Sequence, residues 1–98
     1  MTTLPHPGHA ALAALDAALA RQPRQDGAAL ERATTCLSAV RDGMIAEMRA
    51  GRAYGDLTKL NAVISVVLAG RFPLGEIPWD ELRRARGWLA DLVERVEP

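Results

Sequence analysis

The chain has 98 residues, which is enough for one small domain and too few for two. Its 12 basic and 12 acidic side chains cancel, so no long-range field draws the whole molecule to nucleic acid or to an anionic membrane. Cys36 is the one cysteine, and the fold therefore does not depend on an oxidising compartment. We expect a cytoplasmic protein.

The sequence contains no segment suited to a membrane. Its longest apolar run, 62–69, is interrupted only by Ser65 and is far shorter than the roughly 20 residues that cross a bilayer. The first residues lack the basic start and apolar core of a secretory signal. Eleven of the 12 basic residues are arginine and alanine is abundant, which we interpret as the mark of a GC-rich, bacterium-like genome.

The N-terminal segment 1–8 contains Pro5 and Pro7, whose fixed φ and missing N–H groups disfavour regular structure. We therefore expect a flexible arm there, followed by a single helical domain over 9–98.

The first predicted helix covers 9–21 and is rich in alanine. Three leucines, Leu12, Leu15 and Leu19, follow one face of it at helical spacing. Because leucines among alanines bury little area, we expect this helix to be peripheral.

The second predicted helix begins after Asp26, a good N-cap, and runs to about Ala50. Its apolar seam steps by three or four residues, as in a helix that packs lengthwise on another. The seam consists of Leu30, Ala33, Leu37, Val40, Met44 and Met48. Gly43 inside the helix predicts either close approach of a neighbouring backbone or a mild kink.

A short connection, 51–55, is bounded by two glycines and predicts an antiparallel αα-hairpin. The central helix that follows is capped by Asp56 and ends at Gly70. Its valines and isoleucine also suit a buried strand. However, its length and caps favour a helix, and the chain has no second strand-like run to pair with it.

The segment 70–78 predicts a loop whose apolar residues plug the end of the core. The last helix begins near Pro78, with Asp80 and Glu81 in its first turn. Its seam consists of Leu82, Ala85, Leu89, Leu92 and Val96.

The predicted fold is thus all-α. It is a small helical bundle with three main helices, the hairpin closed by the C-terminal helix, and the alanine-rich helix at the periphery. We expect a homodimer, because a chain this short has apolar surface in excess of what it can cover. Candidate interface anchors on the last helix are Trp79, Leu82, Trp88 and Leu92. A single compact bundle of four helices around one core is the alternative.

No residue pattern in the sequence indicates a catalytic site, a metal site or a cofactor site. His6 and His9 have a spacing that suits a metal only on a helix, and no carboxylate or thiolate lies nearby. A nucleophilic Cys36 would need a base, and both histidines lie near the N-terminal arm. We therefore expect a protein that is not an enzyme.

One cluster of polar residues suggests a ligand-binding site. A small-ligand or nucleotide site at the hairpin turn would use Arg52, Tyr54, Lys59 and Asn61. A line of small or polar residues, Asn61, Ser65 and Ala69, fits helix packing better than the floor of a pocket. Thr34 is a candidate hydrogen-bond partner for Asn61.

The densest basic patch consists of Arg83, Arg84 and Arg86, and would serve an accessory nucleic-acid binder. Nearby carboxylates neutralise much of it, and the tight Gly turn is followed by the most apolar segment, which is a poor match for a DNA-reading helix. Our leading hypothesis is a non-enzymatic interaction or regulatory protein that acts as a helical homo-oligomer and presents a helical surface to a protein partner. The ligand-binding and nucleic-acid-binding functions are the alternatives.

Overall fold

The computed structural model describes the backbone of residues 7–51 and 57–96, and the side chains as far as Glu94. These ranges contain four helices joined by loops, and no strand occurs within them. The helices are α1 (Pro7–Ala20), α2 (Gly27–Arg49), α3 (Leu57–Arg71) and α4 (Trp79–Val96). The predicted all-α class is confirmed.

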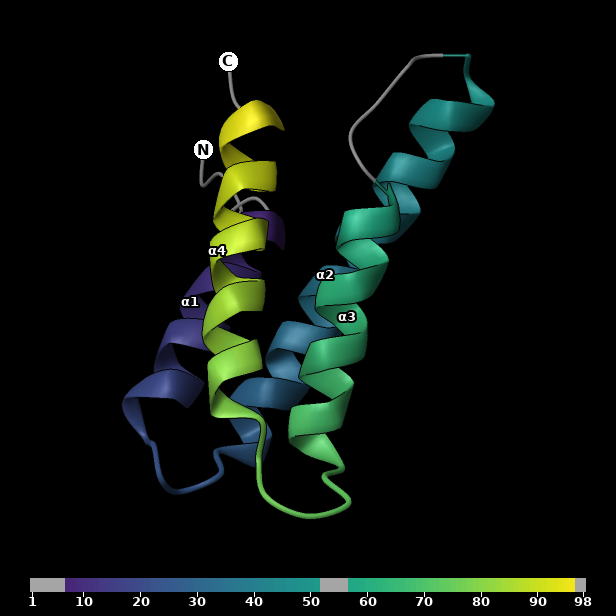
Figure 1. Cartoon of the computed structure of the whole chain (residues 1–98). Helices are drawn as coiled ribbons and strands as arrows, with labels where there is room; N and C mark the ends of the chain where they lie inside the picture. Colours follow the sequence, from purple (N-terminus) through teal and green to yellow (C-terminus); the bar gives the residue numbers. More distant parts are fainter. Residues whose placement is uncertain (1–6, 52–56, 97–98) are drawn as a thin grey trace.

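The helices form a closed ring. Each one packs against two neighbours, in the order α1, α2, α3, α4 and back to α1, while no Cα atoms of the diagonal pairs lie within 8 Å of each other in the described residues. Successive helices run in opposite directions, so the start of α1 and the end of α4 lie at the same end of the bundle (Figure 1). This is the arrangement of an up-down-up-down four-helix bundle.

One core lies inside the ring and takes side chains from all four helices. Its largest fully buried members are Leu15, Leu30, Leu37, Leu60, Val63, Val67, Leu82 and Leu89. Burial of each contributes about 1.5–3 kcal/mol, so the core is shared between the helices and does not belong to one hairpin.

The structure corrects the expectation that the first helix is peripheral. Leu15 of α1 is fully buried, as is Ala11, and α1 packs against both α2 and α4. The alanines are the physical reason, because their small side chains allow α1 to lie close to its neighbours. The helix also begins earlier than expected, at Pro7, a residue favoured in the first helical turn. The remainder of the predicted arm, 1–6, lies outside the described residues.

Both predicted ends of α2 are confirmed. The Asp26 carboxylate accepts a hydrogen bond from the Ala29 N–H at 3.0 Å, as an N-cap does. The helix ends at Arg49, with Ala50 as its C-cap. Gly51 then adopts φ +82°, a left-handed conformation that glycine allows at little cost. The predicted cap Asp56 of the next helix lies outside the described residues.

Two glycines behave differently from expectation. Gly70 does not end α3, which continues to Arg71. It is buried, and a Cβ placed on it would lie 3.2 Å and 3.3 Å from the two terminal methyl carbons of Leu82 on α4. A Cβ placed on Gly43 of α2 would instead meet no atom of the described residues within 4 Å, so none of the four helices approaches it closely. The close approach occurs at Gly70, where α3 meets α4.

The C-terminal end of α3 is held by the loop between α1 and α2. The Gln25 side chain donates hydrogen bonds to the backbone carbonyls of Gly70 at 2.7 Å and Arg71 at 3.0 Å. The last carbonyls of a helix have no partner within the helix, so Gln25 supplies one from a distant part of the chain.

A matched pair of substitutions tests the role of the glycines. Gly70→Leu is expected to lower the free energy of unfolding by about 1–3 kcal/mol, because its side chain would overlap Leu82. Gly43→Leu, where space is open, is expected to raise it by up to about 1 kcal/mol through helix propensity. Chemical denaturation measures both values, and equal effects of the two substitutions would contradict the packing at Gly70.

The role of Gln25 is tested by Gln25→Ala. Loss of two hydrogen bonds to backbone carbonyls is expected to lower the free energy of unfolding by roughly 1 kcal/mol. Pro23→Ala is not a suitable comparison because it alters the backbone, so Arg24→Ala serves as the control in the same loop. A denaturation midpoint that does not differ between the two variants would show that the Gln25 contact adds nothing.

Candidate functional site

The outward side of α3 forms an unusual surface, which we call the α3 outer surface. Its exposed residues are Thr58, Asn61, Ser65, Leu68, Ala69 and, just after the helix, Phe72. Leu68 is 38% exposed and Phe72 66% exposed. No charged residue occurs between Lys59 and Arg71, so the helical part of this surface is apolar or neutral along its length.

The origin of this surface is the composition of α3. Leu60, Val63, Val67 and Gly70 form the stripe that faces the core. A helix in the corner of a four-helix ring buries one such stripe, and α3 has apolar residues on its other sides as well. Some of them therefore remain at the surface of the single chain.

Phe72 extends the α3 outer surface into the following loop. The Arg71 guanidinium carbon lies 4.8 Å from the centre of the Phe72 ring, a cation–π contact worth about 0.5–1 kcal/mol at an exposed site. Leu74, two residues further on, is fully exposed. Exposed apolar side chains thus gather at the C-terminal end of α3.

The predicted ligand site at the hairpin turn is described only in part. Arg52 and Tyr54 lie outside the described residues. Lys59 is half-buried on α3, and Asn61 is exposed on the α3 outer surface. Thr34, the proposed partner of Asn61, instead donates its hydroxyl hydrogen bond to the Leu30 carbonyl of its own helix at 2.9 Å.

Two of the four predicted interface anchors are core residues. Leu82 is fully buried and Leu92 is 6% exposed, because both face the centre of the ring, so neither is available to a second molecule. Trp79 and Trp88 are half-buried and pack at the edge of the core. They are nine residues apart, or two and a half helical turns, and so lie on opposite margins of α4.

The predicted basic patch is divided by its partners. Arg83 donates to Asp80 at 2.9 Å and also to Gln22. Arg86 pairs with Asp16 of α1 at 2.9 Å. That hydrogen bond, together with the negative charge of Asp16, raises the pKa of Arg86 above its ordinary value. Arg84 is exposed and takes no part in these pairs, so the three arginines do not act as one free patch.

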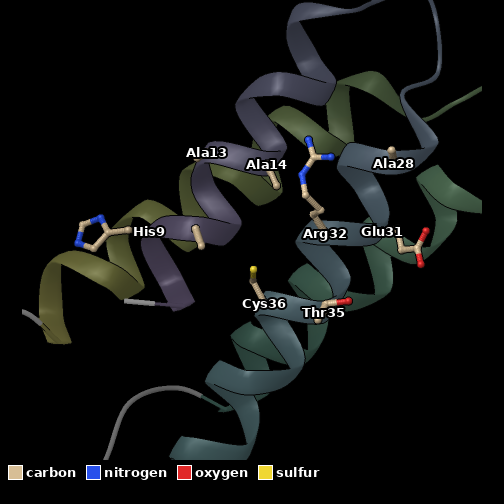
Figure 2. Close-up of a pocket in the computed structure, with 9 residues that line it drawn as sticks. His9, Ala13, Ala14, Ala28, Glu31, Arg32, Thr35 and Cys36 are labelled. Atoms are coloured by element: carbon tan, nitrogen blue, oxygen red, sulfur yellow. The ribbon is translucent and has the colours of Figure 1, made fainter. Parts of the chain in front are cut away.

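A groove between α1 and α2 was not predicted. Its volume is about 760 Å³, and its lining residues are His9, Ala10, Ala13, Ala14, Ala28, Glu31, Arg32, Thr35 and Cys36. Figure 2 shows Arg32 and Cys36 directed toward α1, with the His9 ring turned away from Cys36. Four of the nine lining residues are alanines, three of them on α1. Their spacing on α1 was the available signal, but it does not reveal which helix lies opposite.

The arrangement of titratable groups is sparse. Within residues 7–51 and 57–94, no three side chains of His, Cys, Asp or Glu gather as a metal site would require. The helices of the described part include none with the length and hydropathy of a bilayer span. The features left for binding are the α3 outer surface, the groove and the exposed charges of α4.

Comparison with known proteins gives no further guide, since no family model, curated protein or solved structure matches the chain.

The burial of Leu82 in the core is tested by truncating its side chain. Leu82→Ala is expected to lower the free energy of unfolding by about 2–5 kcal/mol, as for a leucine removed from a core. Glu94→Ala, at an exposed position of the same helix, is expected to change it by no more than about 0.5 kcal/mol. Equal, small effects in a denaturation experiment would place Leu82 at the surface and contradict the described core.

Proposed function

We propose that this chain is a non-enzymatic interaction protein that acts as a helical homo-oligomer in the cytoplasm of a bacterium-like cell and presents the α3 outer surface to a protein partner. The observation that carries the proposal is the exposure of Leu68, on a helix without charge between Lys59 and Arg71, and of Phe72, just after the end of that helix. Exposed apolar residues that gather in one place mark interaction sites in small soluble domains.

The energetics favour a protein partner on this surface. Covering a leucine or phenylalanine side chain contributes about 1.5–3 kcal/mol when burial is complete. The helical part of the α3 outer surface adds little desolvation cost, since buried charges need partners and no residue between Lys59 and Arg71 is charged. The small side chains of Ser65 and Ala69 leave room for a partner helix to approach closely.

A small-ligand function is the second candidate, and the α1–α2 groove is the observation in its favour. The groove has the volume of a small-molecule site, and Arg32 supplies a positive charge beside its apolar floor. Thermal shift with small apolar carboxylates would test this candidate, with Arg32→Gln expected to abolish any stabilisation.

The proposed function is tested by binding assays on the full chain. A double variant, Leu68→Glu with Phe72→Glu, places two charges on the α3 outer surface and is expected to lose proteins that the unmodified chain captures from native extract. The matched control is Ala39→Glu with Ala46→Glu, at two exposed positions of α2. Circular dichroism confirms that each variant is folded.

The contradicting result is plain. Capture of the same proteins by the unmodified chain and by the α3 double variant would show that the α3 outer surface is not the binding surface. Capture lost equally in the α2 control would attribute the effect to added negative charge.

A further inference from the structure

The outward side of α4 contains a glycine that the chain itself does not require. Gly87 lies in the middle of α4, is exposed, and has open space where a Cβ would be. Glycine within a helix costs roughly 1 kcal/mol relative to alanine. Gly70 has a packing reason in Leu82, whereas among the described residues nothing approaches Gly87. A close approach from outside the chain would supply the reason.

The residues around Gly87 have two distinct sides. On one side, Arg83 and Arg86 reach Gln22 and Asp16 and are directed toward α1. Because α4 has α1 and α3 as its neighbours, the opposite margin faces α3. Trp88 lies on that margin, half-buried, and a large aromatic side chain at the edge of an exposed helix is a common anchor of an interface.

Two exposed charges lie at equal distances from the midpoint between Gly87 and Trp88. Arg84 is three residues before Gly87, and Asp91 is three residues after Trp88. Both are exposed, and neither forms an ion pair with another residue of the described chain. Their neighbours Arg83 and Arg86, in contrast, are both paired. Arg84 and Asp91 therefore carry opposite charges on either side of the midpoint between Gly87 and Trp88, and neither charge is neutralised within the described chain.

We infer that α4 packs against α4 of a second copy of the chain, in an antiparallel two-fold contact centred between Gly87 and Trp88. In this arrangement Arg84 of each copy lies opposite Asp91 of the other, so the two-fold axis generates two ion pairs. Gly87 permits the two helix backbones to approach at the axis, and Trp88 of each copy fills the space beside it. The inference rests on the homo-oligomeric part of the proposed function and gives it a surface.

The charge pattern selects a second copy and its direction. A parallel pair would place Arg84 opposite Arg84 and Asp91 opposite Asp91, and like charges across a contact are unfavourable. The antiparallel pair is complementary to itself, with no requirement for a different partner sequence. Around Gly43, the other exposed mid-helix glycine of this kind, the flanking charges are Arg41, Asp42 and Glu47. Glu47 already has an interaction within the chain, so this glycine supports no contact of the same kind.

A charge-exchange experiment tests the contact. Sedimentation velocity is used to measure the dimer dissociation constants of the full chain, Arg84→Asp, Asp91→Arg, and an equimolar mixture of the two variants. Each single variant places like charges opposite each other twice and is expected to dimerise at least about tenfold more weakly. The mixture restores opposite charges at both positions in a heterodimer, so its affinity is expected to return close to that of the unmodified chain.

Two controls complete the experiment. Arg41→Asp makes the same charge change at an exposed position of α2, the helix diagonal to α4, and is expected to leave the dissociation constant unchanged. Gly87→Leu is expected to weaken dimerisation by blocking the approach of the backbones, while Gly43→Leu is expected to leave it unaffected. Circular dichroism establishes that each variant has retained its helices.

The outcomes distinguish this inference from the proposed function. A dimer that responds neither to the single variants nor to Gly87→Leu would overturn the α4 contact and leave the homo-oligomer intact. A chain that is monomeric at all concentrations tested would overturn both. Weak single variants whose mixture stays monomeric would also overturn the contact, because the charges would then act within one chain.

Discussion

The structure depends on one constraint. The helix α3 is apolar on more sides than a single neighbouring helix can cover. Between Lys59 and Arg71 no side chain is charged, so every orientation of α3 places apolar residues toward its neighbours and some toward solvent. In the folded chain, α2 packs against one side of α3 and α4 packs against the other. The stripe from Leu60 to Gly70 is buried, and the α3 outer surface is what remains.

The other features follow from closing a ring around that stripe. Gly70 removes the side chain that would separate α3 from Leu82, and Gln25 satisfies the carbonyls at the same end of α3. The small residues of α1 let it fill the fourth corner between α2 and α4, with Leu15 reaching the centre. Surfaces not used for closure, on α3 and on α4, are those available for recognition.

Much of the fold is predictable from local signals, while the tertiary roles of single residues are not. The Asp26 cap, the end of α2 and the class of all four helices follow from patterns within a turn or two. The role of Gly70 required knowledge that Leu82 lies opposite, and the burial of α1 required knowledge of how closely alanine helices approach. For the same reason Leu82 and Leu92 were assigned to an interface, since a seam residue looks alike whether its own chain or another covers it. The groove beside Cys36 is formed by two helices together, and the spacing of alanines on α1 does not by itself reveal that α2 lies opposite.

Native-state hydrogen exchange measures the central claim most directly, because it reports the free energy at which each helix opens. If α3 is the packed element around which the ring closes, its amides from Leu60 to Gly70 exchange only through global unfolding, together with those of the core-facing turns of α2 and α4. Exchange of α3 at a clearly lower free energy, while α1 and α2 stay protected, would show that the bundle holds together without α3 and would contradict this account.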